Sequence, residues 1–132
     1  MTLQDQMNRL LDAAPDISLL AFGDLSSGLI LNWAARAPCP REGLDLLGEQ
    51  AARCFALMGP DRLDGTVAGP AMIHFTEHET RIFVRAGTGP DEAGPQDSGF
   101  DDVVCAVCDA GAELEPLFHA ACDLANKIAG TA

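Results

Sequence analysis

Three short runs of nearly continuous apolar residues constrain the fold of this chain more than any other feature. They cover residues 17–22, 29–34 and 103–108. Runs of this length predict β-strands, and a strand that lacks polar alternation needs cover on both of its faces. The chain therefore predicts a sheet packed between helices, because a sheet with one solvated face would show alternation.

Three segments are predicted as the covering helices. In residues 3–14 the apolar side chains share one helical face, Thr2 is the expected N-cap and Pro15 ends the helix. The second helix starts after Pro40 and runs to about residue 58, and the third covers about 112–129 with Pro116 in its first turn. The core face of the third helix is expected to be Leu114, Leu117, Phe118, Ala121, Leu124, Ala125 and Ile128.

The strands are predicted to form hairpins. A turn at 23–28 joins the first two strands, and Glu77-His78-Glu79 joins strands at 71–76 and 80–85. The order is then α-β-β-α-β-β-β-α, an α+β fold whose five-stranded, mostly antiparallel sheet has helices packed on it. We expect residues 1–132 to form a single domain, with a loop at 61–69 and a long flexible loop at 86–100.

Charge and composition exclude several classes of function. The 132 residues include 20 Asp and Glu but only 8 Lys and Arg, which gives a net charge of −12. Such a chain is unsuited to nucleic acid or to an anionic membrane surface. No apolar run approaches the roughly 20 residues that span a bilayer, and no signal peptide is evident. Together with five cysteines, read as reduced thiols, this predicts a cytoplasmic protein without membrane insertion.

The best metal-binding pattern in the sequence fails on geometry. Cys105, Cys108, His119 and Cys122 approach the spacing of a zinc site. Two cysteines three residues apart in a strand point to opposite faces, however, so one ion could not gather all four side chains. His74 and His78, with Glu77 and Glu79, lie around a hairpin tip and are expected to be solvated. We therefore expect no metal and no cofactor.

No catalytic motif is present either. Gly87-Thr88-Gly89 lacks the third glycine of a dinucleotide loop, no Walker sequence occurs, and no serine lies in a G-x-S-x-G elbow. The acidic pairs Asp91-Glu92 and Asp101-Asp102 have no evident reason to be desolvated. The chain is accordingly expected not to be an enzyme and to have no catalytic residues.

The helix at 41–58 carries two apolar stripes rather than one. Its core stripe is Leu44, Leu47, Ala51, Phe55 and Met58, and the opposite stripe is Leu46, Gln50, Arg53 and Leu57. An outer stripe of this kind can pack on another subunit, although single leucines on a surface are also common. Burying two leucines yields about 3–6 kcal/mol before association costs. Strand pairing along 71–76 would have to help, so the expected interface is Leu46, Gln50, Arg53, Leu57, Ala71, Ile73 and Phe75.

A second candidate surface is acidic. Residues 86–126 contain nine acidic residues and no lysine or arginine. This tract is either a solvated face that aids solubility or a docking surface for a basic patch on a partner. In the second case its association would slow as salt rises.

The order of elements resembles the Roadblock/LC7 family, dynein light chain-like proteins with a profilin-like sheet. The resemblance covers nearly the whole chain. It depends on the opening amphipathic helix, Pro15-Asp16-Ile17 before the first strand, the turn from Asp24 to Gly28, the long helix after the second strand, and residues 103–108 followed by a helix. The loop at 86–100 is longer than the family's turn.

The resemblance implies a homodimeric, non-enzymatic scaffold that binds or regulates a small Ras-like GTPase or another protein partner. In the family's dimer, the second helix and the strand after it meet their symmetry mates. Two other readings remain open. One is an acidic, dimeric, secretion-chaperone-like protein, which would place its second helix after a third strand. The other is a PAS- or profilin-type sensor that binds a small ligand on its sheet.

Overall fold

The computed structural model describes residues 2–25, 27–58, 71–86 and 102–131, with the backbone alone at 56–58, 86 and 126–131. Its elements follow the predicted order, which confirms the α+β fold with a five-stranded sheet. They are α1 (Leu3–Ala13), β1 (Ile17–Asp24), β2 (Leu29–Ala35), α2 (Arg41–Met58), β3 (Ala71–Phe75), β4 (Glu79–Ala86), β5 (Asp102–Asp109) and α3 (Leu114–Thr131).

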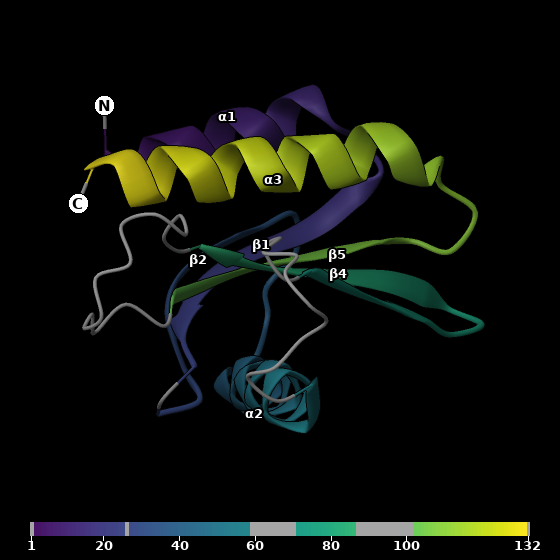
Figure 1. Ribbon diagram of the computed structural model, residues 1–132. Coiled ribbons are helices and arrows are strands. Elements are labelled where there is room, and N and C mark those ends of the chain that lie inside the picture. The colour runs from purple at the N-terminus through teal and green to yellow at the C-terminus, as the bar shows by residue number, and fades with distance from the viewer. Residues whose placement is uncertain (1, 26, 59–70, 87–101, 132) are drawn as a thin grey trace.

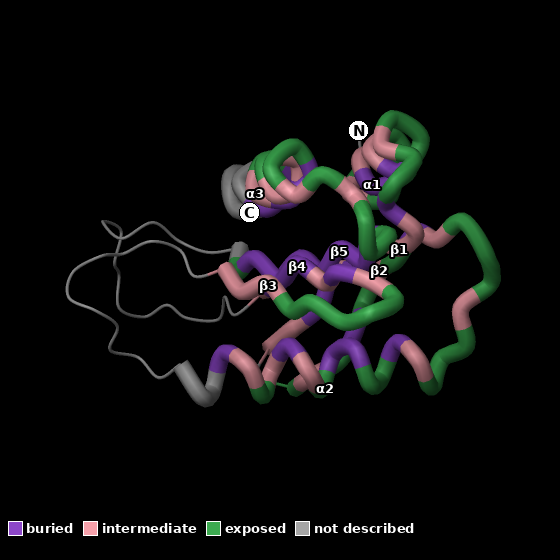
Figure 2. The backbone as a smooth tube through the Cα atoms, turned by 90° about the vertical axis from the view of Figure 1, so that its right-hand side faces the viewer, coloured by how far each residue is buried: buried purple, intermediate pink, exposed green. Residues whose placement is uncertain are grey.

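The sheet has the strand order β2-β1-β5-β4-β3, and every neighbouring pair is antiparallel. β5 therefore lies at the centre, and β2 and β3 form the two edges. Figure 1 shows α1 and α3 side by side over one face of the sheet and α2 under the other. Figure 2 shows the same three layers after a quarter turn.

The two faces of the sheet bury two separate apolar clusters, as the continuous apolar strands predict. On β5, Val104, Ala106 and Cys108 point toward α1 and α3. The alternate residues Val103, Cys105 and Val107 point toward α2. All six are buried, because each face of this central strand has a helical layer against it.

Helix α1 is fixed at both of its ends. At its start, Thr2 and Asp5 form a capping box, in which the Asp5 N–H donates to Thr2 Oγ1 at 3.1 Å and the Thr2 N–H donates to Asp5 Oδ2 at 3.3 Å. At its end, the Arg36 guanidinium donates to the carbonyl oxygens of Ala14 at 2.9 Å and Ile17 at 2.7 Å, and also to that of Leu11. One cation thereby provides hydrogen bonds to carbonyl oxygens at the end of α1 and at the start of β1.

Helix α2 lies unusually close to the β1–β2 turn. Gly28 in that turn has a φ of +73°, a conformation that glycine adopts at little cost. A Cβ atom on Gly48 would lie 2.4 Å from the Gly28 carbonyl oxygen. The helix and the turn can therefore approach this closely only because Gly48 has no side chain, whereas Gly28 is needed for its positive φ.

The observed boundaries differ from the predicted ones by one or two residues. β4 ends at Ala86, which the sequence assigns to the long loop, and α3 begins at Leu114 rather than near 112. β1 and β5 are longer than their apolar runs, because Asp24 pairs with Asp102 and the ladder continues through polar residues. The loop at 61–69, residues 87–100 of the long loop and the side chain of Ile128 lie outside what the structure describes.

Candidate functional site

A chain of polar contacts joins α2 to the edge of the sheet. The guanidinium of Arg81 on β4 donates from Nη1 to Gln50 Oε1 at 2.5 Å and from Nε to Glu79 Oε2 at 2.6 Å. Gln50 Nε2 lies 3.3 Å from Nδ1 of His74 on β3. Because Gln50 Oε1 already accepts from Arg81, Nε2 is the donor to His74. The His74 ring is exposed.

The structure places the predicted interface residues on two sides of the edge strand. Leu46 and Arg53 are exposed on α2, and Leu46 has 63% of its surface accessible. On β3, Ala71 and Ile73 pack against the α1–α3 cluster, and Phe75 is 64% exposed. The side chain of Leu57 lies outside the described residues. Alternate residues of a strand point the same way, so Ala71, Ile73 and Phe75 all lie on the face of the sheet opposite to α2.

Three other residues adjoin α2 at this edge, and the prediction omitted them. Met72 packs against the α2 cluster, and His74 and Arg81 contact Gln50. Strand alternation could have found them. Arg81 is two residues from Phe83 on β4, so both point to the face of the sheet that α2 covers, where Phe83 is buried. His74 pairs with Arg81 in the strand register and therefore points to the same face.

The two edges of the sheet are not equivalent. On β2, Gln4 Nε2 donates to the Trp33 carbonyl oxygen at 3.0 Å, and Arg41 Nη2 donates to the Ile30 carbonyl oxygen at 3.2 Å. The Arg41 guanidinium also lies over the Trp33 ring, 5.5 Å from its centroid. Side chains from α1 and α2 thus block strand addition at β2. Within the described residues, no side chain bonds to the backbone of β3 in this way.

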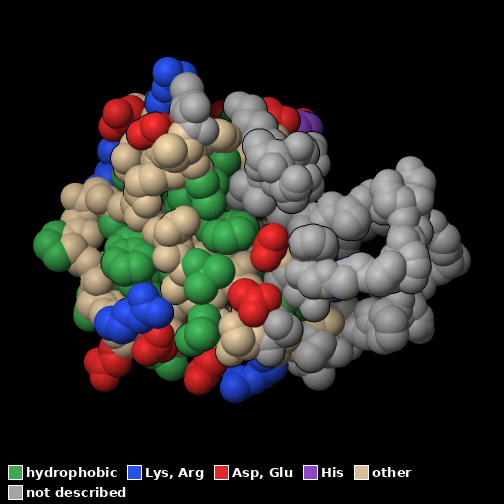
Figure 3. Space-filling model, turned by 90° about the vertical axis from the view of Figure 1, so that its left-hand side faces the viewer, with side chains coloured by type: hydrophobic (Ala, Val, Ile, Leu, Met, Phe, Trp, Pro, Cys, Tyr) green, Lys and Arg blue, Asp and Glu red, His purple; other side chains and the backbone are tan. Residues whose placement is uncertain are grey.

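Apolar side chains are nevertheless exposed on β2. Leu29, Leu31 and Trp33 have 47%, 52% and 37% of their surface accessible. Figure 3 views the molecule from the end where the β1–β2 turn lies, and it shows hydrophobic side chains gathered between the upper helices and the lower part of the molecule. These residues offer a matched comparison for Leu46, because they are as apolar but lie on a blocked edge.

The cysteines and histidines of the zinc-like pattern do not converge. Cys105 lies in the α2 cluster, Cys108 lies in the α1–α3 cluster, and His119 is exposed on α3. The predicted opposition of the two cysteines is confirmed. His78 contacts Glu77 at 4.0 Å, whereas Glu79 pairs with Arg81. No group of three or more metal-ligating side chains occurs within the ranges that the structure describes.

Burial makes the two strand thiols poor acids. It raises the pKa of Cys105 from 9.0 to about 12, with a smaller opposing effect of Arg81. It raises the pKa of Cys108 to about 11, helped by the charges of Asp109 and Asp16. Thiols of this kind stay protonated at neutral pH and are inert.

We expect the free energy of unfolding to fall as the pH rises from about 9 toward 11. In that window both thiols ionise in the unfolded chain but not in the folded one, so each ionisation favours unfolding, by about 1 kcal/mol per thiol near pH 10. Urea unfolding at pH 8.5 and pH 10 measures the loss. The Cys105→Ala/Cys108→Ala variant is the control. If its free energy of unfolding fell between pH 8.5 and pH 10 as much as that of the native protein, the two thiols could not be the cause of the loss.

The described helices include none long and apolar enough to cross a membrane. Searches of sequence families and of curated proteins found no match to the chain. Solved structures do match, and they define the fold.

The chain has a Roadblock/LC7-like fold. It superimposes on a Roadblock/LC7 domain from Streptomyces avermitilis with a TM-score of 0.68 at 12% identity, over 97% of this chain and 95% of that one. It also matches two MglB structures. One, described as having a tetrameric arrangement, gives a TM-score of 0.70 at 18% identity over 97% of this chain and 85% of that one. The other, a gliding protein MglB from Thermus thermophilus, gives 0.66 at 18% identity over 98% and 90%.

Proposed function

We propose that two copies of this chain pair through α2 and the free edge of β3, and that the dimer is a non-catalytic regulator of a small Ras-like GTPase. The observation that carries the dimer is the edge itself. β3 ends the sheet without side chains bonded to its backbone among the described residues, and β2 ends it with such bonds. Antiparallel pairing of two β3 strands would continue the sheet across both copies.

Exposed apolar side chains on both sides of the edge support the same pairing. Leu46 on α2 and Phe75 at the end of β3 are among the most exposed large apolar residues of the described chain. Their burial would add hydrophobic stabilisation to the hydrogen bonds of the strand pair. Gln50 contributes by bonding to both His74 and Arg81, which holds α2 and the edge strand in one rigid surface.

The shared fold supports the regulatory part of the proposal. The family that the sequence resembles acts as scaffolds and regulators, and the solved structures that match share its architecture. The position of α2 directly after β2 also disfavours the secretion-chaperone-like reading, which needs a third strand before that helix.

A GTPase assay tests this function directly. Small Ras-like GTPases from the source organism would be loaded with GTP, and hydrolysis and nucleotide release would be measured with and without the protein. We expect the protein to change the rate of GTP hydrolysis or of nucleotide release about tenfold for at least one GTPase. This is an effect of about 1.4 kcal/mol on the barrier. Leu46→Glu should abolish the effect and Leu31→Glu should keep it. If no GTPase bound the protein and none changed its rates, the regulatory role would be refuted. The dimer is tested separately, by the molecular mass of the protein in solution.

A further inference from the structure

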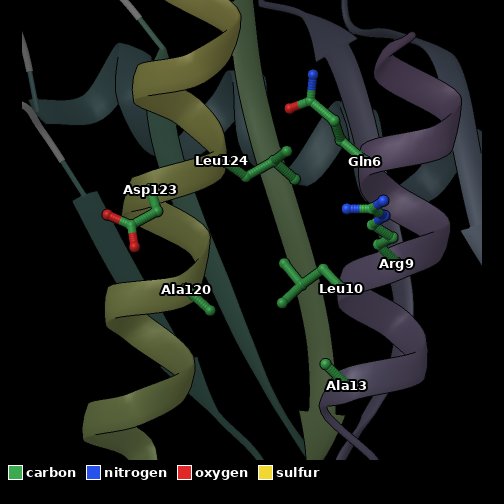
Figure 4. A pocket seen from close by; sticks show the side chains of 7 residues that line it. All are labelled: Gln6, Arg9, Leu10, Ala13, Ala120, Asp123 and Leu124. Atoms are coloured by element: carbon green, nitrogen blue, oxygen red, sulfur yellow. The ribbon is translucent and has the colours of Figure 1, made fainter. Parts of the chain in front are cut away.

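A groove of about 530 Å³ lies between α1 and α3, on the opposite side of the sheet from α2. Its apolar lining includes Leu10 and Leu124 and the small residues Ala13 and Ala120. Figure 4 shows the lining side chains of the two helices with the sheet behind them. The proposed dimer would leave this groove free.

One polar atom beside the groove has no hydrogen-bond partner among the described residues. Gln6 projects from α1 toward α3, and its Oε1 is buried. No donor within the described residues reaches that oxygen. A buried acceptor without a donor is unusual in folded proteins. Because the terminal torsion of glutamine turns easily, the amide can present its oxygen to a donor that enters the groove.

The surroundings of the groove are acidic. The exposed acids of the two helices and of the turn before α3 are Asp5, Asp12, Glu113, Glu115 and Asp123, and Asp123 lines the groove itself. The basic residues of the two helices are Arg9, which also lines the groove, and Lys127 of α3, and His119 lies 3.9 Å from Glu115. The five acids still outnumber them. A second copy of this chain would bring the same acidic face against its own, and the two would repel. The charge favours a basic occupant.

The shape of the groove selects the form of that occupant. Its α1 wall runs from Gln6 to Ala13, and seven residues of helix rise about 10 Å, or two turns. Two helices lying side by side present a furrow into which a third helix can place its own apolar ridge, with residues at i, i+3 or i+4, and i+7.

We propose that the α1–α3 groove binds a basic amphipathic helix of a protein partner. The apolar ridge of that helix packs on Leu10 and Leu124, with the alanines giving room for its bulk. A lysine beside the ridge donates to Gln6 Oε1 and lies near the carboxylate of Asp123. This binding is independent of the proposed dimer, because it uses the other face of the sheet.

A designed peptide tests the proposal. The probe is a fluorescein-labelled 18-residue helix of leucine and lysine, with two-turn leucine ridges and flanking lysines, and the reference is a scrambled peptide of the same composition. We expect fluorescence anisotropy to give saturable binding at least about tenfold tighter for the ordered peptide. Raising the salt should weaken it. Amide shifts of the ¹⁵N-labelled protein should cluster on α1 and α3.

Matched variants separate the groove from general acidity. Asp123→Lys should weaken binding about tenfold, and Glu42→Lys, the same charge change at an exposed position of α2 on the other face of the sheet, should have little effect. Ala13→Trp should block the groove, whereas Asn8→Trp on the same helix should not. Gln6→Leu should weaken binding several-fold without lowering the melting temperature, which a merely structural glutamine would not do.

Three results would overturn the proposal. The scrambled peptide could bind as well as the ordered one, which would reduce the interaction to net charge. The amide shifts could map to α2 and β3 rather than to the groove. Ala13→Trp could instead abolish a self-association of the protein, in which case the groove would belong to a second copy.

Discussion

Replacing Leu46 with glutamate is expected to convert the proposed dimer into a monomer. The side chain is 63% exposed in the single chain, so the change should cost the fold little. In the proposed dimer it would bury a carboxylate where an apolar side chain had packed. Losing about 1.5–3 kcal/mol for each of two leucines, with the desolvation of two charges added, predicts a dissociation constant raised at least about a hundredfold.

Sedimentation equilibrium measures this result directly. The native protein should approach twice the 13.9 kDa of the chain at micromolar concentration, and the variant should sediment as a single chain. Leu31→Glu is the matched control, because Leu31 is 52% exposed on the β2 edge, where Gln4 and Arg41 occupy backbone carbonyls. A native monomer at these concentrations would refute the dimer, and so would an equal loss of mass in both variants.

The two outer faces of the molecule would then serve different partners. The α2 and β3 side provides a strand edge that no side chain of the described residues occupies, together with exposed apolar residues, and these suit an identical copy. The α1 and α3 side provides a groove in an acidic surface, which suits a basic chain. The sheet between them is buried on both faces along β5. A module of this kind can hold a copy of itself and another protein at once, because the two surfaces do not overlap.

The sequence predicted the parts of this fold that depend on local patterns. The apolar run at 103–108 identified the central strand, and Thr2 and Pro15 set the ends of α1 to within one residue. Each of these features depends on residues that are neighbours in the sequence, because hydrogen bonding or burial within one element determines it. The same holds for the opposite placement of Cys105 and Cys108.

The sequence did not predict contacts that depend on how the elements meet. The bond from Gln50 to His74 joins residues 24 positions apart, and it requires knowing that α2 crosses toward β3. The sequence also gave no indication that Met72 and His74 are the strand residues that contact α2 within the chain. The orphan oxygen of Gln6 also gave no signal, since a glutamine in an amphipathic helix is ordinary until its neighbours are placed.

The close approach of Gly48 to Gly28 is another such contact, and it predicts that Gly48→Ala destabilises the protein although alanine favours helices. In a helix interior alanine gains about 1 kcal/mol over glycine. At Gly48 the new Cβ would lie 2.4 Å from the Gly28 carbonyl oxygen and 3.1 Å from its carbon, both backbone atoms. Moving the helix or the turn should cost about 2–3 kcal/mol, which outweighs the gain.

Gly43 in the same helix provides the control for this prediction. A Cβ there would meet only Cys39 Sγ, at an ordinary 3.8 Å. Gly43→Ala should therefore stabilise the protein by up to about 1 kcal/mol. Urea unfolding at matched protein concentration compares the two variants, because the proposed dimerisation would link stability to concentration. If Gly48→Ala proved as stabilising as Gly43→Ala, α2 could not lie against the β1–β2 turn, and the surface that it forms with β3 would have to be placed differently.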